Sequence, residues 1–187
     1  MKKIELHDTY AYENFINVEE QLFLLKWIEE NINLFKINYA KSGGELYGSR
    51  KLYIVENEND GCFDLVKKIK NRVIEIENIK DWIEEPYFKD LIGINETGGS
   101  IHQHTDPNIE GYTHTRYNVI LKYPTYGGHS IYNGKINVLK ENMAWRCVAG
   151  RVVHGSVPVK GEIPRITLSL GFLIKNEEND KTYKTII

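Results

Sequence analysis

The chain has 187 residues and a mass of 21.7 kDa, which predicts one domain that is long enough to bury its own core. Apolar residues make up 41% of the chain and charged residues 27%, and these ordinary values exclude wholesale disorder. The net charge of −2 argues against a protein whose main task is to neutralise phosphates, so we expect no nucleic-acid partner. Two cysteines cannot build a disulfide framework, and no apolar run approaches the roughly 18 residues of a membrane span. We therefore expect a soluble, cytoplasmic protein with no membrane contact, and the sequence leaves its oligomeric state open.

The first third of the chain has helical patterning. Asn17 followed by Glu20 resembles a capping box, and apolar residues then recur at helical spacing, which predicts an amphipathic helix over 18–34. A loop at 41–44, a short strand over 51–55 and a second helix over 61–75 are expected next. Residues 1–85 are thus expected to form covering helices and N-terminal support.

From Leu91 onward the pattern changes to short β-rich runs separated by turn residues. Eight strands are predicted, over residues 91–96, 100–106, 115–123, 129–133, 135–140, 144–149, 151–156 and 165–174. Many short strands at tight spacing are typical of a β-sandwich or barrel. The sequence therefore predicts a mainly β fold with N-terminal helices, a jelly roll, as a single domain over 1–187. Its core spans 86–174, and 175–187 form a C-terminal tail.

One histidine-rich segment could hold a metal. His104 and Asp106 are two residues apart, so on a strand their side chains share a face. His154, at the end of a later predicted strand, offers a third ligand. Two histidines and one carboxylate make the facial triad, which leaves positions open on iron. His102 also shares that face and could replace His104 in a cupin-type His-x-His site.

The predicted strand over 165–174 alternates in character over residues 165–170. Its even positions are apolar, whereas Arg165, Thr167 and Ser169 occupy the odd positions. An arginine that faces the interior is costly unless a carboxylate meets it, and the strand itself offers none. Two interpretations stay open: a salt bridge to an acidic residue elsewhere in the chain, or a bound dicarboxylate that the guanidinium grips with two hydrogen bonds.

Together these residues resemble the Fe(II)- and 2-oxoglutarate-dependent dioxygenases, whose pattern is His-x-Asp, a distal His, and an Arg about ten residues later with a hydroxyl residue two beyond. The matching positions are His104, Asp106, His154, Arg165 and Thr167. Upstream, the run Asn95-x-x-Gly98-x-x-Ile101-x-x-His104-x-Asp106 is similar to prolyl-hydroxylase-like members, with Asn95 where they often have Tyr. The stretch around Arg116, Tyr117 and Asn118 resembles small bacterial and phage members and the aspartyl/asparaginyl hydroxylases.

The resemblance implies a double-stranded β-helix, the cupin-like form of the jelly roll, and a shared reaction. Fe(II) would sit on His104, Asp106 and His154, which are therefore the catalytic candidates. The 2-oxoglutarate co-substrate would chelate that iron, and Arg165 would pair with its far carboxylate. Thr167, Ser169, Asn118 and Asn95 complete the candidate co-substrate site. O2 would convert 2-oxoglutarate to succinate and CO2 while a C–H bond of an amino acid, peptide side chain or small metabolite is hydroxylated.

Three further residues are candidates for contact with the substrate. Arg116 and Asn118 share a face of one predicted strand, so Arg116 could bind a substrate carboxylate if that face is turned inward. Tyr112 and His114 are expected in the loop after the metal pair. Two alternatives remain: a non-oxidative, cupin-type metal enzyme or binding module, and, less favoured, a nucleic-acid demethylase of the same superfamily. The substrate itself, the biological pathway and the choice between hydroxylation and another oxidation are not encoded in these motifs.

Overall fold

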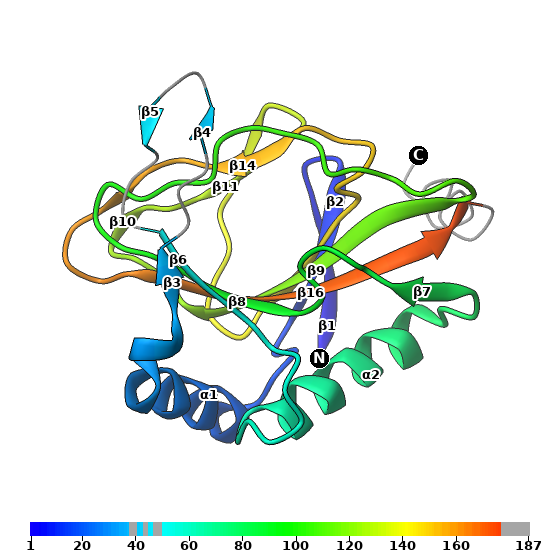
Figure 1. Ribbon diagram of the computed structural model, residues 1–187. Helices are drawn as coiled ribbons and strands as arrows, with labels where there is room; N and C mark the ends of the chain where they lie inside the picture. Colours follow the sequence, from blue (N-terminus) through cyan, green and yellow to red (C-terminus); the bar gives the residue numbers. More distant parts are fainter. Residues whose placement is uncertain (38–40, 43–44, 47–49, 177–187) are drawn as a thin grey trace.

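A computed structural model describes residues 1–37, 41–42, 45–46 and 50–176 of the chain (Figure 1). The expected loop glycines at 43–44 and the expected tail beyond residue 176 lie outside this range. Strands are the main element, as predicted. Among the described residues, no helix has the length and apolar character needed to cross a membrane.

The named helices of the described residues are α1 (Val18–Glu30), the 3-10 turn Ile32–Leu34, and α2 (Phe63–Glu77). The strands before residue 100 are β1 (Lys2–Leu6), β2 (Thr9–Glu13), β3 (Lys36–Ile37), β4 (Lys41–Ser42), β5 (Glu45–Leu46), β6 (Arg50–Ile54), β7 (Trp82–Glu84) and β8 (Leu91–Asn95). The later strands are β9 (Tyr112–Lys122), β10 (Tyr126–Gly127), β11 (Ser130–Tyr132), β12 (Lys135–Asn137), β13 (Ala144–Cys147), β14 (His154–Ser156), β15 (Val159–Lys160) and β16 (Arg165–Lys175).

One large sheet organises the molecule. Its strand order is β1-β2-β13-β9-β16-β8-β6-β3, with β7 added to β16, and every pairing is antiparallel. The last strand in sequence, β16, therefore lies at the centre, between β9 and β8. Small sheets made of β12-β11-β14 and β10-β15 lie across from it, and both helices cover its opposite face (Figure 1). This arrangement confirms the predicted jelly roll with covering helices.

The alternation along β16 explains how the sheet separates core from pocket. Leu168, Leu170 and Phe172 are fully buried and belong to the main core cluster, together with α2 residues such as Ile69. The odd positions project from the other face of the sheet, where Arg165 begins the strand. The period-2 pattern thus fixes which face binds helices and which faces a cavity.

The helix N-terminus at Asn17 forms as predicted. Its side chain accepts a hydrogen bond from the Glu20 amide at 2.8 Å, and the Glu20 carboxylate accepts one from the Asn17 amide at 3.2 Å. The predicted end at residue 34 is wrong, because the Asn31 side chain donates to the Trp27 carbonyl and α1 stops at Glu30. The remaining residues of the apolar pattern form the separate 3-10 turn.

Three other expectations need correction. Residues 100–106 are an irregular segment rather than a strand, and His104 makes only an isolated bridge to His154. Ladder pairing along this segment is limited to that point, since Gly98-Gly99 and Pro107 flank it. The N-terminal hairpin β1–β2 was not predicted, and its nearly fully buried strand β2 extends the large sheet through β13. Finally, only residues 154–156 of the predicted strand 151–156 are extended.

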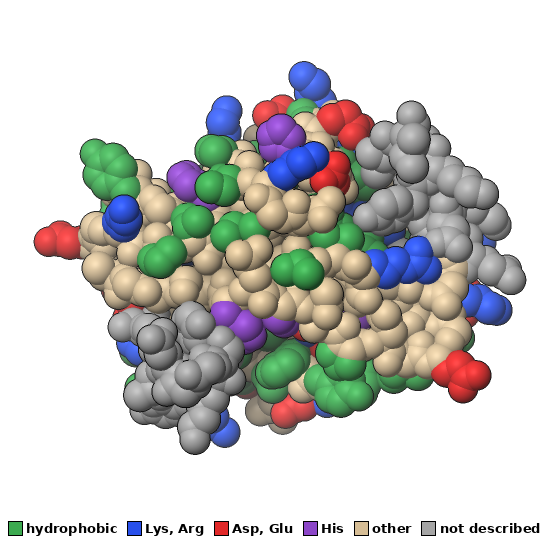
Figure 2. Space-filling model, turned by 90° about the horizontal axis from the view of Figure 1, so that it is seen from above, with side chains coloured by type: hydrophobic (Ala, Val, Ile, Leu, Met, Phe, Trp, Pro, Cys, Tyr) green, Lys and Arg blue, Asp and Glu red, His purple; other side chains and the backbone are tan. Residues whose placement is uncertain are grey.

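From above, the molecule presents the face that carries the small sheets (Figure 2). Histidine side chains reach the surface at several points of this face. Lysine and arginine side chains are scattered among hydrophobic and acidic ones there, rather than gathered into one basic area. Several polar and charged side chains gather instead in an internal pocket, described next.

Candidate metal centre and adjoining pocket

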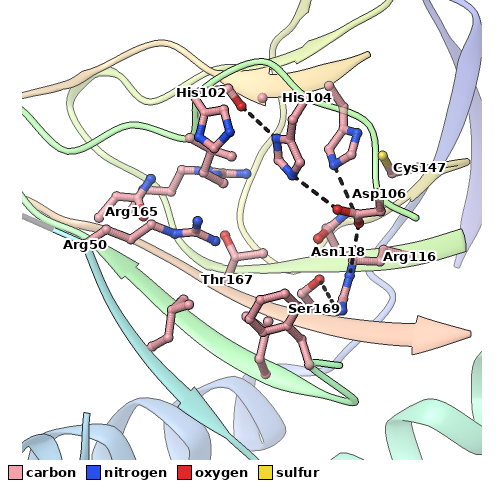
Figure 3. A pocket seen from close by; sticks show the side chains of 18 of the residues that line it. Arg50, His102, His104, Asp106, Arg116, Asn118, Cys147, Arg165, Thr167 and Ser169 are labelled. Carbon is pink, nitrogen blue, oxygen red and sulfur yellow. Dashed lines mark hydrogen bonds and ion pairs between the residues drawn. The ribbon is translucent and has the colours of Figure 1, made fainter. Parts of the chain in front are cut away.

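A pocket of about 280 Å³ lies between the large sheet and two segments, one with His104 and the other, β14, with His154. Figure 3 shows His104 and other residues of the lining. Three neighbouring strands, β6, β8 and β16, supply one wall in matched rows. Arg50, Asn95 and Arg165 form the first row. Leu52, Gly93 and Thr167 form the second, in which a Cβ on Gly93 would meet Leu52 Cδ2 at 3.4 Å. The other lining residues are Phe88, Leu91, Ile101, His102, His104, Asp106, Arg116, Asn118, Trp145, Cys147, His154, Gly155 and Ser169.

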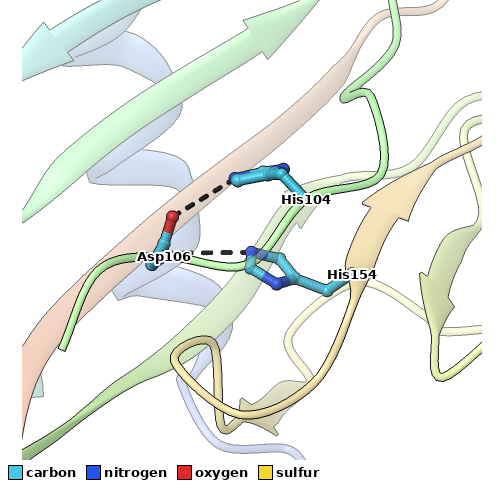
Figure 4. A group of neighbouring side chains, drawn as sticks. All are labelled: His104, Asp106 and His154. Carbon is cyan, nitrogen blue, oxygen red and sulfur yellow. Dashed lines mark ion pairs between the residues drawn. The ribbon is translucent and has the colours of Figure 1, made fainter.

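The three predicted metal ligands lie together at one end of this pocket (Figure 4). One potential ligand atom from each of His104, Asp106 and His154 lies within 4.8 Å of the others. The Nε2 atom of His104 is 3.2 Å from Asp106 Oδ1, and that of His154 is 3.9 Å from Asp106 Oδ2. Two imidazoles and one carboxylate in this arrangement fit the facial set that holds non-haem Fe(II).

Backbone carbonyls fix the orientation of both imidazoles. His104 Nδ1 donates to the His102 carbonyl at 2.8 Å, and His154 Nδ1 donates to the Val152 carbonyl at 3.1 Å. A carbonyl can only accept, so Nδ1 of each ring carries a proton, and Nε2 is the atom that faces Asp106 and can bind a metal once it is unprotonated. A second hydrogen bond of this kind is the usual way in which a metal-binding histidine is oriented.

The charges at this end favour an ionised carboxylate and a neutral His154. Burial lowers the pKa of His154 to about 4, against the opposing attraction of Asp106. Burial alone would raise the pKa of Asp106, but a hydrogen bond from His104 and the nearby His114, His154 and Arg116 hold it well below its ordinary value. The same hydrogen bond raises the pKa of His104. The centre thus carries an anion ready for a cation.

A buried ion pair stands behind Asp106. Arg116 Nε is 3.7 Å from Asp106 Oδ2, and Arg116 Nη2 is 2.6 Å from Glu85 Oε2. The same guanidinium contacts Ser169 Oγ at 3.3 Å. Glu85 is fully buried and also accepts hydrogen bonds from the amides of Tyr87 and Phe88. Arg116 is thereby held between two carboxylates of the chain.

The opposite end of the pocket is rich in donors and poor in acids (Figure 3). Arg165 is 4% exposed, and its one hydrogen bond among the described residues goes to Ser130 Oγ at 3.0 Å. Burial lowers the pKa of this guanidinium to about 10. Five buried donor atoms of the lining have no hydrogen-bond partner among the described residues: Arg50 Nε, Asn95 Nδ2, Trp145 Nε1, Arg165 Nε and Thr167 Oγ1. Each such atom costs about 1–3 kcal/mol unless a ligand satisfies it.

The structure brings most predicted site residues to this one pocket. The lining includes Asn95, Asn118, Thr167 and Ser169, so the strand face that bears Arg116 and Asn118 is turned inward, as predicted. Their binding roles remain predictions. The 11-residue spacing between His154 and Arg165 in the sequence would suit two adjacent antiparallel strands, but the structure does not pair them. β14 pairs with β11 and β16 lies in the large sheet, so Arg165 faces the metal end across the pocket, not from an adjacent strand.

Two candidate substrate residues lie differently from expectation. Tyr112 and His114 are in strand β9, not in a loop, because this β-rich run pairs with Lys175 and Leu173 of β16. The Tyr112 hydroxyl lies 3.3 Å from Asp81, outside the pocket lining. His114 is 1% exposed, and its Nε2 lies 3.6 Å from Asp106 Oδ2.

Sequence analysis missed two residues of the site. Arg50 lies one residue before the predicted strand 51–55, and only its pairing with Asn95 brings it beside Arg165. Glu85 lies between β7 and β8 and has no motif around it. Extending the alternation of the 51–55 strand back by one position would have placed Arg50 on the face of Leu52.

Comparison with known proteins yields similarity in structure alone. No protein-family model matches the chain, and no curated protein matches its sequence. A prolyl-4-hydroxylase from Pseudomonas putida is similar with a TM-score of 0.60 and 10% identity, over 89% of this chain and 91% of that one. The viral collagen prolyl hydroxylase from Paramecium bursaria Chlorella virus-1, a 2OG complex, gives 0.63 and 14%, over 88% and 95%.

A third similar structure is the epimerase SnoN from nogalamycin biosynthesis, in complex with Fe3+, alpha ketoglutarate and nogalamycin RO. Its TM-score is 0.68 and its identity 13%, over 89% of this chain and 79% of that one. At these identities the comparison establishes the fold, and it agrees with the predicted double-stranded β-helix. The chain has the fold of the prolyl hydroxylases and of an alpha-ketoglutarate-dependent epimerase.

Proposed function

We propose that the chain is an Fe(II)- and 2-oxoglutarate-dependent oxygenase that hydroxylates a C–H bond of an amino acid, a peptide side chain or a small metabolite. The observation that supports this proposal is that a candidate metal site and a candidate carboxylate site lie at the two ends of one pocket. His104, Asp106 and His154 offer a facial metal set at one end. Arg165, without a carboxylate partner among the described residues, lies at the other.

The residues present fit both groups. Two neutral-nitrogen ligands and one carboxylate suit Fe(II) and leave room for further ligands. The buried donors of Arg165, Thr167 and Asn95 lack partners within the described chain, as expected of a site for an anionic ligand. Fe(II) in that position supplies O2 activation, in which R–H, 2-oxoglutarate and O2 become R–OH, succinate and CO2.

The chain's own contribution is to bind, orient and fix charge. Arg165 would grip the far carboxylate of the oxo acid, with the hydroxyls of Ser130 and Thr167 beside it. Carbonyl hydrogen bonds keep Nε2 of both histidines turned to the metal position. The Arg116–Glu85 pair holds Asp106 ionised and in place. Apolar side chains such as Leu52 and Leu91 limit water along the wall.

The alternative function, a non-oxidative metal enzyme or binding module, does not require Arg165 to bind a carboxylate. Fluorescence or calorimetric titration of the Fe(II)-loaded chain with 2-oxoglutarate, under anaerobic conditions, separates the two. We expect saturable binding that requires the metal, followed by succinate formation when O2 and a panel of amino acids and peptides are added. Because similar folds include hydroxylases and an epimerase, products are identified by mass and by stereochemistry. Absence of metal-dependent 2-oxoglutarate binding would refute the oxygenase.

The two cysteines bear on the cellular compartment. Cys62 and Cys147 are both buried and free in the described structure. Burial raises the pKa of each thiol, so neither is a ready thiolate. We propose a reducing, cytoplasmic setting, which fractionation of the tagged chain would test.

A further inference from the structure

The pocket holds more positive charge than its metal and co-substrate account for. Three arginines line it: Arg50, Arg116 and Arg165. Two carboxylates of the chain oppose these three positive charges: Glu85, which pairs with Arg116, and Asp106 at the metal end. One positive charge is therefore left over among these groups. Fe(II) adds two positive charges and 2-oxoglutarate removes two, so the loaded pocket still lacks one negative charge.

Arg50 is the arginine to which the described residues give no partner. It starts β6 and pairs across the sheet with Asn95, which pairs on its other side with Arg165. The two arginines thus flank Asn95 on alternate strands, roughly 10 Å apart between backbones. Arg50 Nε is buried and has no hydrogen-bond partner among the described residues. The neighbouring cation Lys51 is already paired, with Glu96 at 2.6 Å.

The position of Arg50 differs from that of Arg165 in two respects. Arg165 is almost fully buried and has Ser130 Oγ within 3.0 Å, as suits a ligand held deep in the pocket. Arg50 is only partly buried as a residue, although its Nε atom is buried, so its side chain is more accessible than that of Arg165. Figure 3 shows its side chain directed toward Thr167 from the β6 side. Burial and the nearby Arg165 lower the pKa of Arg50 to about 10, in agreement with the lack of a hydrogen-bond partner for its Nε among the described residues.

We propose that Arg50 is a specificity residue that binds a carboxylate of the substrate that is to be oxidised. This inference rests on the proposed function and deepens it by naming the substrate class: a small molecule or peptide terminus with a free carboxylate close to the reacting carbon. A single missing charge favours a carboxylate over a phosphate monoester, which carries about 1.5–2 negative charges at neutral pH. Arg116 is unsuited to this task because Glu85 already occupies its guanidinium.

The test uses N-acetylglycine as the probe and its neutral amide as the matched control. Ligand-observed NMR measures the binding of each probe to the Fe(II)-loaded chain with saturating 2-oxoglutarate, under anaerobic conditions. We expect the carboxylate to bind and the amide to bind at least about tenfold more weakly. Methyl phosphate is the third arm, and tighter binding of methyl phosphate than of N-acetylglycine would overturn the carboxylate assignment.

Arg50→Gln removes the charge and keeps an amide donor, while Arg50→Lys keeps the charge. We expect Arg50→Gln to weaken N-acetylglycine binding about tenfold or more, and Arg50→Lys to recover part of it. The affinity of Arg50→Gln for 2-oxoglutarate should stay within about threefold of wild type, which also shows that the variant folds. Arg165→Gln is the matched control and should lose 2-oxoglutarate instead.

Three further results would overturn the inference. Equal binding of N-acetylglycine by wild type and Arg50→Gln would show that Arg50 does not bind the carboxylate of the probe. A loss of 2-oxoglutarate affinity in Arg50→Gln as large as in Arg165→Gln would make Arg50 part of the co-substrate site. Displacement of the probe by 2-oxoglutarate would place both acids in one subsite. If wild type binds no 2-oxoglutarate, the proposed function fails, and probe binding to the metal-loaded chain alone still tests Arg50 by the same comparison.

Discussion

The two ends of the pocket treat a buried arginine in opposite ways. At the metal end, Arg116 has a carboxylate of the chain at 2.6 Å and a second at 3.7 Å. At the far end, Arg165 has one hydroxyl at 3.0 Å, and no described acidic residue pairs with it. A guanidinium with its own carboxylate fixes geometry, whereas one without it is poised for an acid from solution. The same side chain thus marks a support in one place and a binding site in the other.

The largest effect is expected from loss of a metal ligand. His154→Ala removes one of three ligands, so we expect no iron binding at concentrations that saturate wild type, and no turnover. Anaerobic Fe(II) titration measures the first and succinate formation the second. His102→Ala is the control, since His102 lies outside the triad although its ring is 4.7 Å from that of His104. Equal iron affinity in wild type and His154→Ala would refute this ligand set.

Stability measurements test whether Arg116 supports the fold and Arg165 does not. Arg116→Met leaves Glu85 buried without its partner, and we expect the free energy of unfolding to fall by about 3–5 kcal/mol. Arg165→Met removes a charge that has no acidic partner among the described residues, so its unfolding free energy should fall by less than about 1 kcal/mol, or rise. Urea denaturation with the protein free of ligands measures both. The double variant Arg116→Met with Glu85→Met should recover much of the loss, and equal losses in the two single variants would void the distinction.

The same contrast predicts a change in ligand affinity. Charge-assisted hydrogen bonds contribute about 1.5–3 kcal/mol, so Arg165→Ala should weaken 2-oxoglutarate binding by about tenfold to several hundredfold. Iron affinity should stay the same, because Arg165 is not among the metal ligands. Arg165→Lys should recover only part, since an ammonium cannot reproduce the two parallel hydrogen bonds of the guanidinium. Unchanged 2-oxoglutarate affinity in Arg165→Ala would make Arg165 a structural residue like Arg116.

A third arginine, Arg72, gives the smallest expected effect and extends the comparison beyond the pocket. Its hydrogen bond to Glu20, at 2.6 Å, is the main reason why the pKa of that carboxyl falls to about 2. A pKa lowered by folding adds stability above the ordinary value near 4.5, and this stability is lost as the pH falls toward 2.

Glu20→Gln should therefore lower the unfolding free energy by about 1 kcal/mol at pH 7 and flatten its decline between pH 4.5 and 2. Urea denaturation across this pH range measures both effects. Glu19→Gln, an exposed neighbour in the same helical turn, should change the value at pH 7 by no more than a few tenths of a kcal/mol. Equal pH slopes in wild type and Glu20→Gln would contradict the role of the pair.

The fold class and the three candidate metal ligands could be predicted from the sequence because both leave patterns among residues close in the chain. Alternation along 165–170 indicated which face of β16 is apolar, and His104 and Asp106 are close in sequence. The segment 100–106 was also predicted as a strand, yet it makes a single bridge at His104, because pairing depends on a neighbour that the local sequence cannot reveal. The strand β2 was missed since nearly every residue in it is buried, which erases alternation.

The absence of a partner is harder to predict than its presence. Arg116, Arg165 and Arg50 look alike in sequence, each on or beside a predicted strand. Glu85, which distinguishes Arg116 from the others, lies 31 residues away from it in a segment without a motif. Arg50 and Arg165 are brought together only by the register of β6 and β16 on either side of β8. Such distinctions arise from tertiary pairing, so they require coordinates.

The central place of β16 also has a consequence for biosynthesis. Residues 104–154, with all three metal ligands, leave the ribosome before Arg165, but the inner edges of β8 and β9 stay unpaired until β16 arrives between them. Exposed strand edges of this kind invite pairing with other chains. Folding dominated by such distant pairings takes on the order of milliseconds to seconds. The nascent chain therefore passes through a state that could hold metal, cannot yet bind the oxo acid at Arg165, and is at greatest risk of aggregation.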